Sequence, residues 1–196
     1  MSKQQWKGGT LLAPLPVVMV SCGTTEKPNI ITIAWTGILA SEPPKTYVSV
    51  RKERFSYDMI KNSGEFVINL VNAELVKSAD YCGVASGRNV DKFDTCGLTP
   101  KKAFKLDCPI IEESPLSLEC KVSDIIPLGS HDMFIADIVS VDVEESLIDA
   151  KGRLDLNSAE LVSYSHGEYC KLGKKLGTFG FSVRKKPKTR RGAGRR

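Results

Sequence analysis

Two arginines and two serines lie within eight residues of one another and could together bind a phosphate group. Ser49 and Arg51 share one face of an expected strand, because side chains alternate along a strand. Arg54 and Ser56 follow, where helical spacing of apolar residues begins at Phe55. Guanidinium groups, hydroxyls and the free N–H groups of a helix N-terminus all bind phosphate. We favour Arg51 over Arg54 because it shares a face with Ser49, and an exposed charged turn is the alternative.

The motifs of the commonest nucleotide-binding and hydrolytic sites are missing from the chain. It has no GxGxxG and no GxSxG, and the run 167–175 has five residues between its glycines where a P-loop has four. The only histidines are His131 and His166, too few for a typical histidine-bound metal. We therefore expect no metal site and a chemistry that does not rely on a side-chain nucleophile.

The six cysteines are scattered without a CxxC pair, which disfavours zinc, thioredoxin-like and iron–sulfur centres. In a cytosolic chain such cysteines are mostly reduced, buried thiols. Whether Cys170 is reactive stays open, because it lies beside Tyr169 rather than in an apolar run.

The elements that must position these groups are mostly strands. Stretches with an apolar residue at every second position are typical of half-buried antiparallel strands. We expect strands over 15–21, 30–36, 47–50, 65–70, 116–123 and 133–143, a helix from Phe55 to a terminal Gly64, and a second helix over 72–81 with Asn72 as N-cap. Few helices and many strands with hairpin-length links favour a closed antiparallel barrel over a doubly wound α/β sheet.

Length and charge indicate one folded domain with a basic tail. The chain has 196 residues, of which 41% are hydrophobic and 26% charged, as in an ordinary globular protein. Eight of the 28 basic residues lie after Phe181, with no acidic residue among them. Without them the chain carries about −3, which argues against nucleic acid as a partner of the folded part. We expect a domain over residues 1–183 and a disordered tail over 184–196.

Hydropathy gives an expectation for location. No apolar run approaches the ~20 residues that span a bilayer. The first residues lack the apolar centre of a signal peptide. We therefore expect a cytoplasmic protein with no membrane partner.

Three segments in the same order, 16–21, 46–60 and 86–93, resemble the flavin reductase-like, flavoredoxin-type family, and the resemblance runs from Lys7 to Phe181. It implies an FMN-binding split β-barrel, antiparallel and of Greek-key type, usually a homodimer with the cofactor at the subunit boundary. Electrons would pass from NAD(P)H through bound FMN to a flavin, a metal complex or a small redox protein. The alternative is a flavoredoxin-type carrier with tightly bound FMN and no NAD(P)H oxidase activity.

The resemblance also implies which residues bind the flavin. One group would follow the isoalloxazine ring, a second would approach the ribityl chain and phosphate, and a third would close over the cofactor. In that order they are Thr32, Ala34, Trp35 and Thr36; Ser49, Val50, Arg51 and Ser56; and Ser86, Lys92 and Tyr164. Lys92 could also tune the flavin potential by stabilising the reduced anion. Trp35 as a core or interface aromatic, and Lys92 as a solvated lysine, are the alternatives.

Two histidines are possible catalytic residues by the same resemblance. His131 would lie on the nicotinamide side of the pocket, but Ser130 stands where the family often has an acidic residue. His166 belongs to the segment 161–169, which would reach the active face with Tyr164 and Tyr169. A structural histidine at a strand start, and loop aromatics at a dimer surface, are the alternatives.

Overall fold

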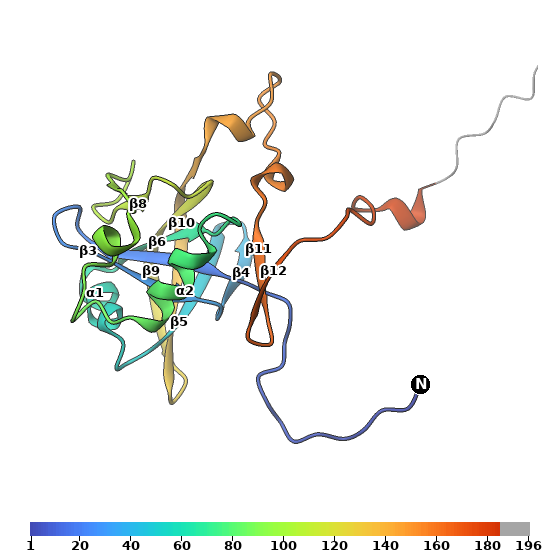
Figure 1. The fold of residues 1–196 in the computed structure, drawn as a ribbon, viewed down its shortest axis with the longest axis horizontal. Helices are drawn as coiled ribbons and strands as arrows, with labels where there is room; N and C mark the ends of the chain where they lie inside the picture. Colours follow the sequence, from blue (N-terminus) through green and yellow to red (C-terminus); the bar gives the residue numbers. More distant parts are fainter. Residues whose placement is uncertain (185–196) are drawn as a thin grey trace, which may run out of the picture.

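A seven-stranded antiparallel sheet forms the body of the computed structural model, which describes residues 1–184 (Figure 1). In the order in which they lie side by side, the strands are β3 (Pro28–Ile33), β2 (Val18–Gly23), β6 (Glu65–Leu70), β9 (Leu116–Pro127), β10 (His131–Val143), β5 (Pro44–Arg51) and β4 (Thr36–Ser41). The long pair β9 and β10 contains two register shifts. Such irregularities bend and twist a strand pair, which helps the sheet to curl.

The two edge strands of this sheet are joined by only Ala34 and Trp35, which lie between the end of β3 and the start of β4. A connection of this length spans roughly 11 Å at most, so the sheet must curl until its edges approach. The N–H of Ser49 on β5 donates to the carbonyl of Trp35 at 2.9 Å, close to that junction. The result is a barrel open along one seam, which confirms the predicted mainly β, antiparallel split barrel.

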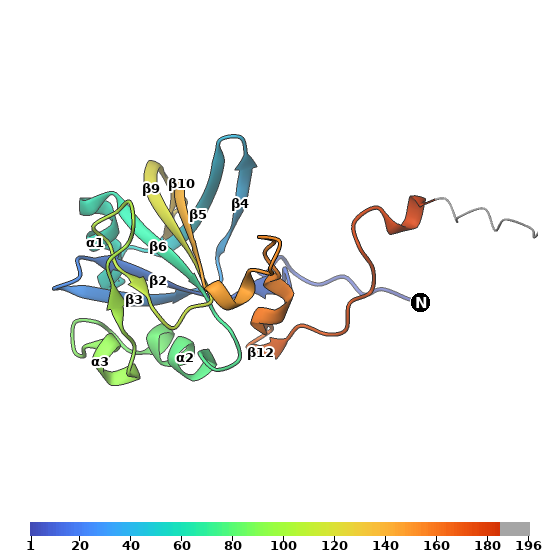
Figure 2. The ribbon, with the colours of Figure 1, turned by 90° about the horizontal axis from the view of Figure 1, so that it is seen from above.

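Three α-helices complete the body (Figure 2). They are α1 (Phe55–Ser63), α2 (Val76–Val84) and α3 (Lys92–Cys96). Tyr57 and Ile60 of α1 pack with the side chains inside the barrel. The apolar faces of α2 and α3 instead pack on the outer side of β2 and β3, through residues such as Ala79 and Phe93.

Strand β2 is buried on both faces, which explains why it reads as a continuous apolar run. Val18 and Val20 point into the barrel, and Met19 points outward beneath α2 and α3. This is the alternation that a strand imposes on its side chains. The helices thus cover the β2–β3 face, and the seam of the barrel lies beside them.

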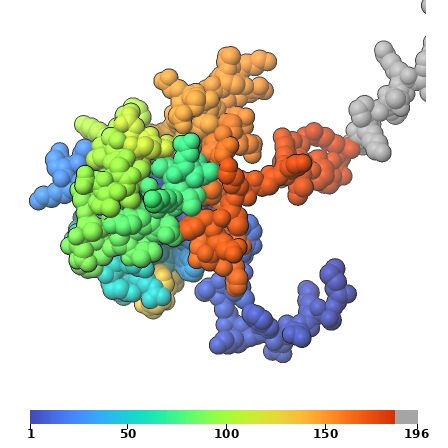
Figure 3. Space-filling view, viewed as in Figure 1, coloured from blue at the N-terminus to red at the C-terminus, as the bar shows by residue number. Residues whose placement is uncertain are grey.

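Two smaller sheets and three 3-10 helices make up the rest of the regular structure in the described part of the chain. Strand β11 (Val162–Ser165) pairs with both β1 (Leu15–Pro16) and β12 (Glu168–Lys171), and β7 (Pro100–Lys101) pairs with β8 (Ile110–Ile111). The 3-10 helices are Glu145–Leu147, Leu156–Ala159 and Phe181–Val183. Figure 3 shows the N-terminal segment and the segment after β12 standing clear of the body on the side of β11 and β12.

Most of the predicted elements agree with the structure. The strand-to-helix change at Phe55 is confirmed, and Gly64 ends α1 with a left-handed φ of 70°. The strands expected over 65–70, 116–123 and 133–143 correspond to β6, β9 and β10, with β9 continuing to Pro127 and β10 beginning at His131. No helix among residues 1–184 has the length and apolar character needed to cross a membrane. Residues 185–196, nearly all of the predicted basic tail, lie outside the described residues.

Three predicted elements differ. The strand over 15–21 is divided, because β1 pairs with β11 in a small sheet and only β2 belongs to the seven-stranded sheet. The single strand over 30–36 is wrong, because the chain leaves β3 after Ile33 and begins β4 at Thr36 on the opposite edge of the sheet. The helix over 72–81 begins later, at Val76. Asn72 instead accepts a hydrogen bond from the N–H of Leu75 through its side chain, at 3.1 Å. An Asx-type turn of this kind competes with helix formation, so the local signal at Asn72 marks a turn before the helix.

Candidate functional site

Two adjoining cavities lie between the N-terminus of α1, helix α2 and the seam of the barrel. The smaller has a volume of about 270 Å³ and the larger about 440 Å³. Ile31, Arg54 and Gly83 line both, so the two form one cleft. Sites for cofactor-sized molecules have volumes of this order. We call the smaller cavity the narrow end of the cleft and the larger the broad end.

The narrow end collects hydrogen-bond donors around the start of α1. Arg54 is the N-cap residue of this nine-residue helix, and no side chain caps the helix there. The first N–H groups of a helix have no partner within it and carry a partial positive charge. Ser56, Ser86 and Arg88 line the same cavity. This set of groups can bind an anion.

The hydroxyl of Ser56 is oriented by a neighbour. Nδ2 of Asn29 donates to Oγ of Ser56 at 2.7 Å, and both side chains are buried. Because the oxygen accepts this bond, its own hydrogen is free to point elsewhere. Ser56 is therefore held as a donor at the second residue of α1.

The loop after α2 closes over the narrow end. Arg88 donates from its guanidinium to the carbonyl of Glu53 at 3.0 Å, and the guanidinium lies 5.5 Å from the centre of the Phe55 ring. A Cβ at Gly87 would come within 2.2 Å of Oδ1 of Asn29 and 2.7 Å of the Phe55 ring. Only glycine allows the loop to approach α1 and β3 this closely.

Lys92 is buried, 4% exposed, at the base of the narrow end. Its Nζ donates to the carbonyl oxygens of Ile30 at 2.7 Å and Cys82 at 2.8 Å, so it joins α3 to β3 and α2. Loss of hydration lowers the pKa of this lysine. The alternative interpretation of Lys92 as a solvated lysine is therefore wrong. One of its three ammonium hydrogens remains free to donate to a ligand in the cavity.

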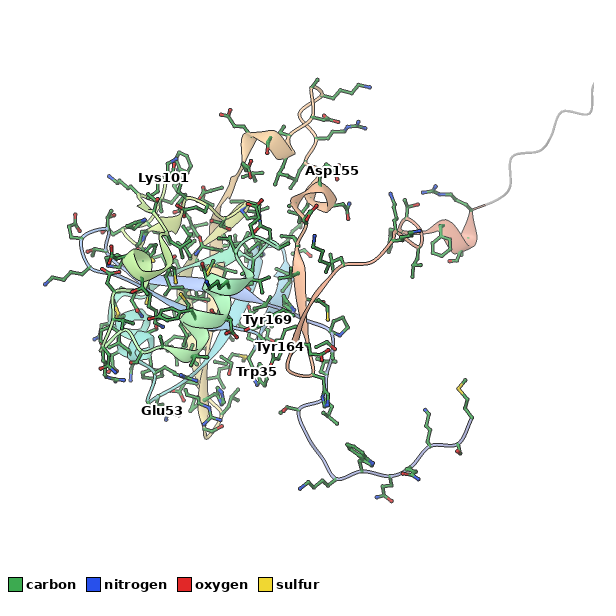
Figure 4. The ribbon with its side chains drawn as sticks, in the orientation of Figure 1. Trp35, Glu53, Lys101, Asp155, Tyr164 and Tyr169 are labelled. Atoms are coloured by element: carbon green, nitrogen blue, oxygen red, sulfur yellow. The ribbon has the colours of Figure 1, made fainter. Side chains whose placement is uncertain are left out.

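The broad end is bordered by aromatic side chains (Figure 4). Trp35, 40% exposed, lies at the seam between β3 and β4. Tyr164 and Tyr169 come from β11 and β12, with ring centres 5.6 Å apart and planes at 61°. The hydroxyl of Tyr169 donates to Asp80 of α2 at 3.1 Å, and burial, with this bond as a second cause, raises the pKa of Tyr169 to about 12. These rings can border a flat ligand.

The strand ends at the seam supply the polar groups of the broad end. Ser49 and Arg51 of β5 line it with His131, which stands opposite Arg51 in the β5–β10 register. The hydroxyl of Thr32 donates to the carbonyl of Ala79, so this side chain joins β3 to α2 rather than facing a ligand with a free hydroxyl.

The structure brings together eleven of the residues singled out in the sequence. They are Thr32, Ala34, Trp35, Ser49, Val50, Arg51, Ser56, Ser86, Lys92, His131 and Tyr164. It also refines the choice between two arginines. Arg54 lines both cavities, whereas Arg51 lines only the broad end, where it is exposed and pairs with Glu53 at 3.5 Å. Arg54 is thus the arginine that lines the narrow end at the start of α1, and the choice of Arg51 as the phosphate-binding arginine stays a prediction.

Two of the expected residues lie elsewhere. Thr36 is buried in β4, and its hydroxyl donates to the carbonyl of Tyr47 at 2.6 Å. The connection through Ala34 and Trp35 carries the chain from β3 to β4, so Thr36 lies on the other edge of the sheet and lines neither cavity. His166 is exposed in the turn between β11 and β12, with a positive φ of 51°, and lines neither cavity.

Sequence reasoning did not single out Arg88, Asp80 or Gly83. Arg88 had a local signal, since it is a cation within the polar loop 86–93. Asp80 and Gly83 had none, because their place in the cleft depends on how α2 packs on β3.

Comparisons with known proteins give the family and support the fold. The family model described as "Flavin reductase like domain" matches residues 11–173. The flavoredoxin structure of Desulfovibrio vulgaris (Miyazaki F) is 34% identical, with a TM-score of 0.86, and covers 93% of this chain and 100% of that one. For the flavoredoxin of Methanosarcina acetivorans the identity is 25%, the TM-score 0.83 and the coverage 94% and 100%. The NADPH-flavin oxidoreductase of Streptomyces viridifaciens is 24% identical over 83% of this chain and 77% of its own length.

Proposed function

This chain belongs to the flavin reductase-like domain family, and from that premise we propose that it binds FMN in the cleft and transfers electrons through it. The observation that carries the proposal is the polarity of the cleft. One end collects cationic and hydroxyl donors at a helix N-terminus, and the other end is bordered by aromatic rings. A phosphorylated flavin has the matching distribution, with a dianion at one end and a flat ring at the other.

The narrow end would hold the phosphate. Arg54, Arg88 and the hydroxyls of Ser56 and Ser86 offer charge-assisted and neutral hydrogen bonds. The N–H groups of α1 add to these. This donor set fits a phosphate monoester, which favours FMN over riboflavin as the resident flavin.

The broad end would hold the ring. Trp35 and the residues from Ile31 to Ala34 would border it on the β3 side, and Tyr164 and Tyr169 on the side of β11 and β12. Ser49 and Val50 would lie beneath the connection between ring and phosphate. When bound, flavin accepts a hydride or single electrons. The protein's part is to orient the ring, exclude water from one face and set the potential through nearby charge such as Lys92.

The electron donor we propose is NAD(P)H, with a flavin, a metal complex or a small redox protein as acceptor. The likeness to the NADPH-flavin oxidoreductase supports a pyridine nucleotide. His131 and Arg51 at the broad end could hold the polar groups of such a donor. The likeness to two flavoredoxins supports the alternative, a carrier that keeps FMN and exchanges electrons only with protein partners.

We further propose a homodimer. An apolar groove of about 520 Å³ lies directly behind the broad end and shares Ala34, Trp35 and Ser49 with it. Leu12, Leu39, Leu128 and Met133 line the rest, and the first three are exposed. Apolar surface of this kind is typical of an interface between protein chains. A second copy seated there would cover Trp35 and border the cofactor. The cytoplasmic location stays a prediction from hydropathy.

The visible spectrum of the purified protein, reconstituted with FMN under anaerobic conditions, tests these proposals. Bound-flavin bands that bleach on adding NADH or NADPH would support the reductase. Bands that bleach only with a reduced redox protein would support the carrier. If reconstitution yields no protein-bound flavin, the FMN proposal is wrong, whatever the donor.

A further inference from the structure

Two cysteines from different helices face each other beside the narrow end of the cleft, and Cys82 is the one that lines it. Cys82 lies in α2, and Cys96 is the last residue of α3. Their Sγ atoms are 4.0 Å apart. Lys92 holds the two helices in this arrangement. Its Nζ donates to the carbonyl of Cys82 in α2, and Lys92 itself lies one turn before Cys96 in α3. A disulfide needs a sulfur separation of about 2.05 Å, so the thiols must approach by about 2 Å.

We propose that Cys82 and Cys96 form a peroxide-sensitive dithiol, which oxidises to an intramolecular disulfide beside the narrow end of the cleft. The proposal does not rest on the electron-transfer function proposed above.

The exposure of the two thiols decides which one meets the oxidant. Cys96 is half-buried, whereas Cys82 is 1% exposed, so Cys96 is the more accessible of the two. Burial raises the pKa of the Cys82 thiol to about 12, with the Cys96 thiol as the second cause. The ammonium group of Lys92 lowers the pKa of the Cys82 thiol by less than burial raises it. Cys96 is thus the attacking thiol and Cys82 the resolving one.

The reaction balances with a peroxide as the oxidant. The Cys96 thiolate attacks one oxygen of hydrogen peroxide, the O–O bond breaks, and the sulfur becomes a sulfenic acid while the second oxygen leaves as water after taking a proton. The Cys82 sulfur then attacks the sulfenic sulfur. The S–O bond breaks, the thiol proton and the hydroxyl leave as a second water, and the S–S bond forms. Both electrons of the dithiol end on the peroxide.

Other readings of the cysteines fit less well. Within residues 1–184 no three His, Cys, Asp or Glu side chains gather as a metal site, which disfavours a metal bound by this pair. The remaining buried thiols face backbone groups. Sγ of Cys22 donates to the carbonyl of Asn29, and Sγ of Cys108 to that of Ser21. Cys170 is exposed on β12 and lines neither cavity.

The disulfide would restrain the part of the cleft that closes over a ligand. Residues 83–95 lie between the two cysteines and include Ser86, Gly87 and Arg88 of the narrow end. A disulfide between Cys82 and Cys96 would join the two ends of this segment and hold both against α2. Oxidation would thereby limit the motion that admits or releases a ligand.

Peptide mapping of the full-length protein tests the proposal. The protein is treated with hydrogen peroxide, remaining thiols are alkylated without reductant, and trypsin cleaves after Arg88 and Lys92. The two cysteines then lie in separate peptides, 78–88 and 93–101. We expect these peptides to appear joined, lighter than their sum by two hydrogens and separated by reductant, and the protein to lose two of its six alkylatable thiols.

Two variants serve as controls. Cys96→Ser keeps the size of a partly exposed side chain, and should abolish the joined peptide and keep Cys82 alkylatable. Cys170→Ser removes the exposed thiol and should leave the joined peptide unchanged. Far-UV circular dichroism checks that both are folded. Full alkylation of Cys82 and Cys96 after peroxide, or Cys96 accumulating as sulfinic acid without a joined peptide, would overturn the proposal. Neither result bears on FMN binding.

Discussion

The hydroxyl oxygen of Ser130 lies 2.9 Å from Nδ1 of His131. Ser130 occupies the place where the family often has an acidic residue, and its hydroxyl bonds to the ring that an acid would have oriented. His131 opens β10 opposite Arg51, at the rim of the broad end of the cleft. The serine therefore restricts the ring orientation of a histidine beside the proposed donor site.

Removing this hydroxyl should weaken donor binding without affecting the flavin. The bond is exposed, so its net contribution is about 0.5–1.5 kcal/mol, or roughly a 2- to 10-fold rise in KM for NAD(P)H in Ser130→Ala. Steady-state kinetics against a flavin acceptor measure it, with the FMN dissociation constant as control. Lys27→Ala, an exposed change in the β2–β3 loop, should leave both constants unchanged. An equal loss of FMN affinity in Ser130→Ala would contradict this role for His131.

Arg54 should discriminate FMN from riboflavin. It lines both cavities at the uncapped N-terminus of α1. A hydrogen bond to a charged group contributes about 1.5–3 kcal/mol, so Arg54→Gln should bind FMN roughly 10- to 100-fold more weakly. Riboflavin lacks the phosphate, and its dissociation constant should barely change. Fluorescence titration measures both.

The matched variant is Arg51→Gln, which removes the same charge from the exposed end of β5. We expect a smaller loss of FMN affinity there than in Arg54→Gln. A larger loss of FMN affinity in Arg51→Gln than in Arg54→Gln would indicate that the phosphate binds beside Arg51 instead.

Lys92 should contribute to stability as well as to the site. Lys92→Met leaves the carbonyl oxygens of Ile30 and Cys82 without their donor. An unsatisfied buried acceptor costs about 1–3 kcal/mol, so the melting temperature should fall. Thermal unfolding of the flavin-free protein measures this, with Lys101→Met as the control, because Lys101 is exposed and bonds only to Glu112. Equal melting temperatures for the two variants would count against the buried bonds.

Asp142 should lower the free energy of unfolding at neutral pH relative to its value near pH 4. Its pKa is raised from 3.8 to about 6, first because burial removes water and second because Glu119 is close, and its Oδ2 has no hydrogen-bond partner among residues 1–184. A carboxyl whose pKa is raised by folding stabilises the fold below its unfolded pKa. That contribution is lost as the pH rises from about 4 through about 6.

Asp142→Asn should remove this pH dependence. Its amide can also donate to Glu119, so we expect a gain of about 1 kcal/mol at pH 7 and little change at pH 4. Urea unfolding at both pH values measures it. A variant that is no more stable than the parent at pH 7 would contradict the raised pKa.

A charge in the apolar groove should separate the proposed dimer. Leu39 lies in this groove and not in the cleft. Leu39→Glu should shift the sedimentation coefficient to that of a monomer, because an unpaired carboxylate is costly to bury at an interface. Phe104→Glu, at a residue 79% exposed on another surface, is the matched control and should stay dimeric. A monomeric parent protein would refute the homodimer directly.

Local patterns in the sequence determine most of the elements. The apolar spacing from Phe55 and the glycine at 64 set both ends of α1, because helix periodicity and the left-handed C-cap are properties of neighbouring residues. Alternation similarly sets β9 and β10, and hence the antiparallel character of the sheet. The other residues of the site were predicted from the resemblance to the family. It pointed to Ser56, Trp35 and Tyr164, which are far apart in the chain.

The tertiary structure decided which of these groups meet, because strand pairing and helix packing act between distant residues. The two-residue connection at Ala34 sends Thr36 to the other edge of the sheet and out of the cleft. The curl of the barrel places Arg54 rather than Arg51 at the narrow end. Burial gives Lys92 two carbonyl partners that no local pattern could supply. The packing of α3 beside α2 brings Cys96 to Cys82, although the two do not form a CxxC pair in the sequence.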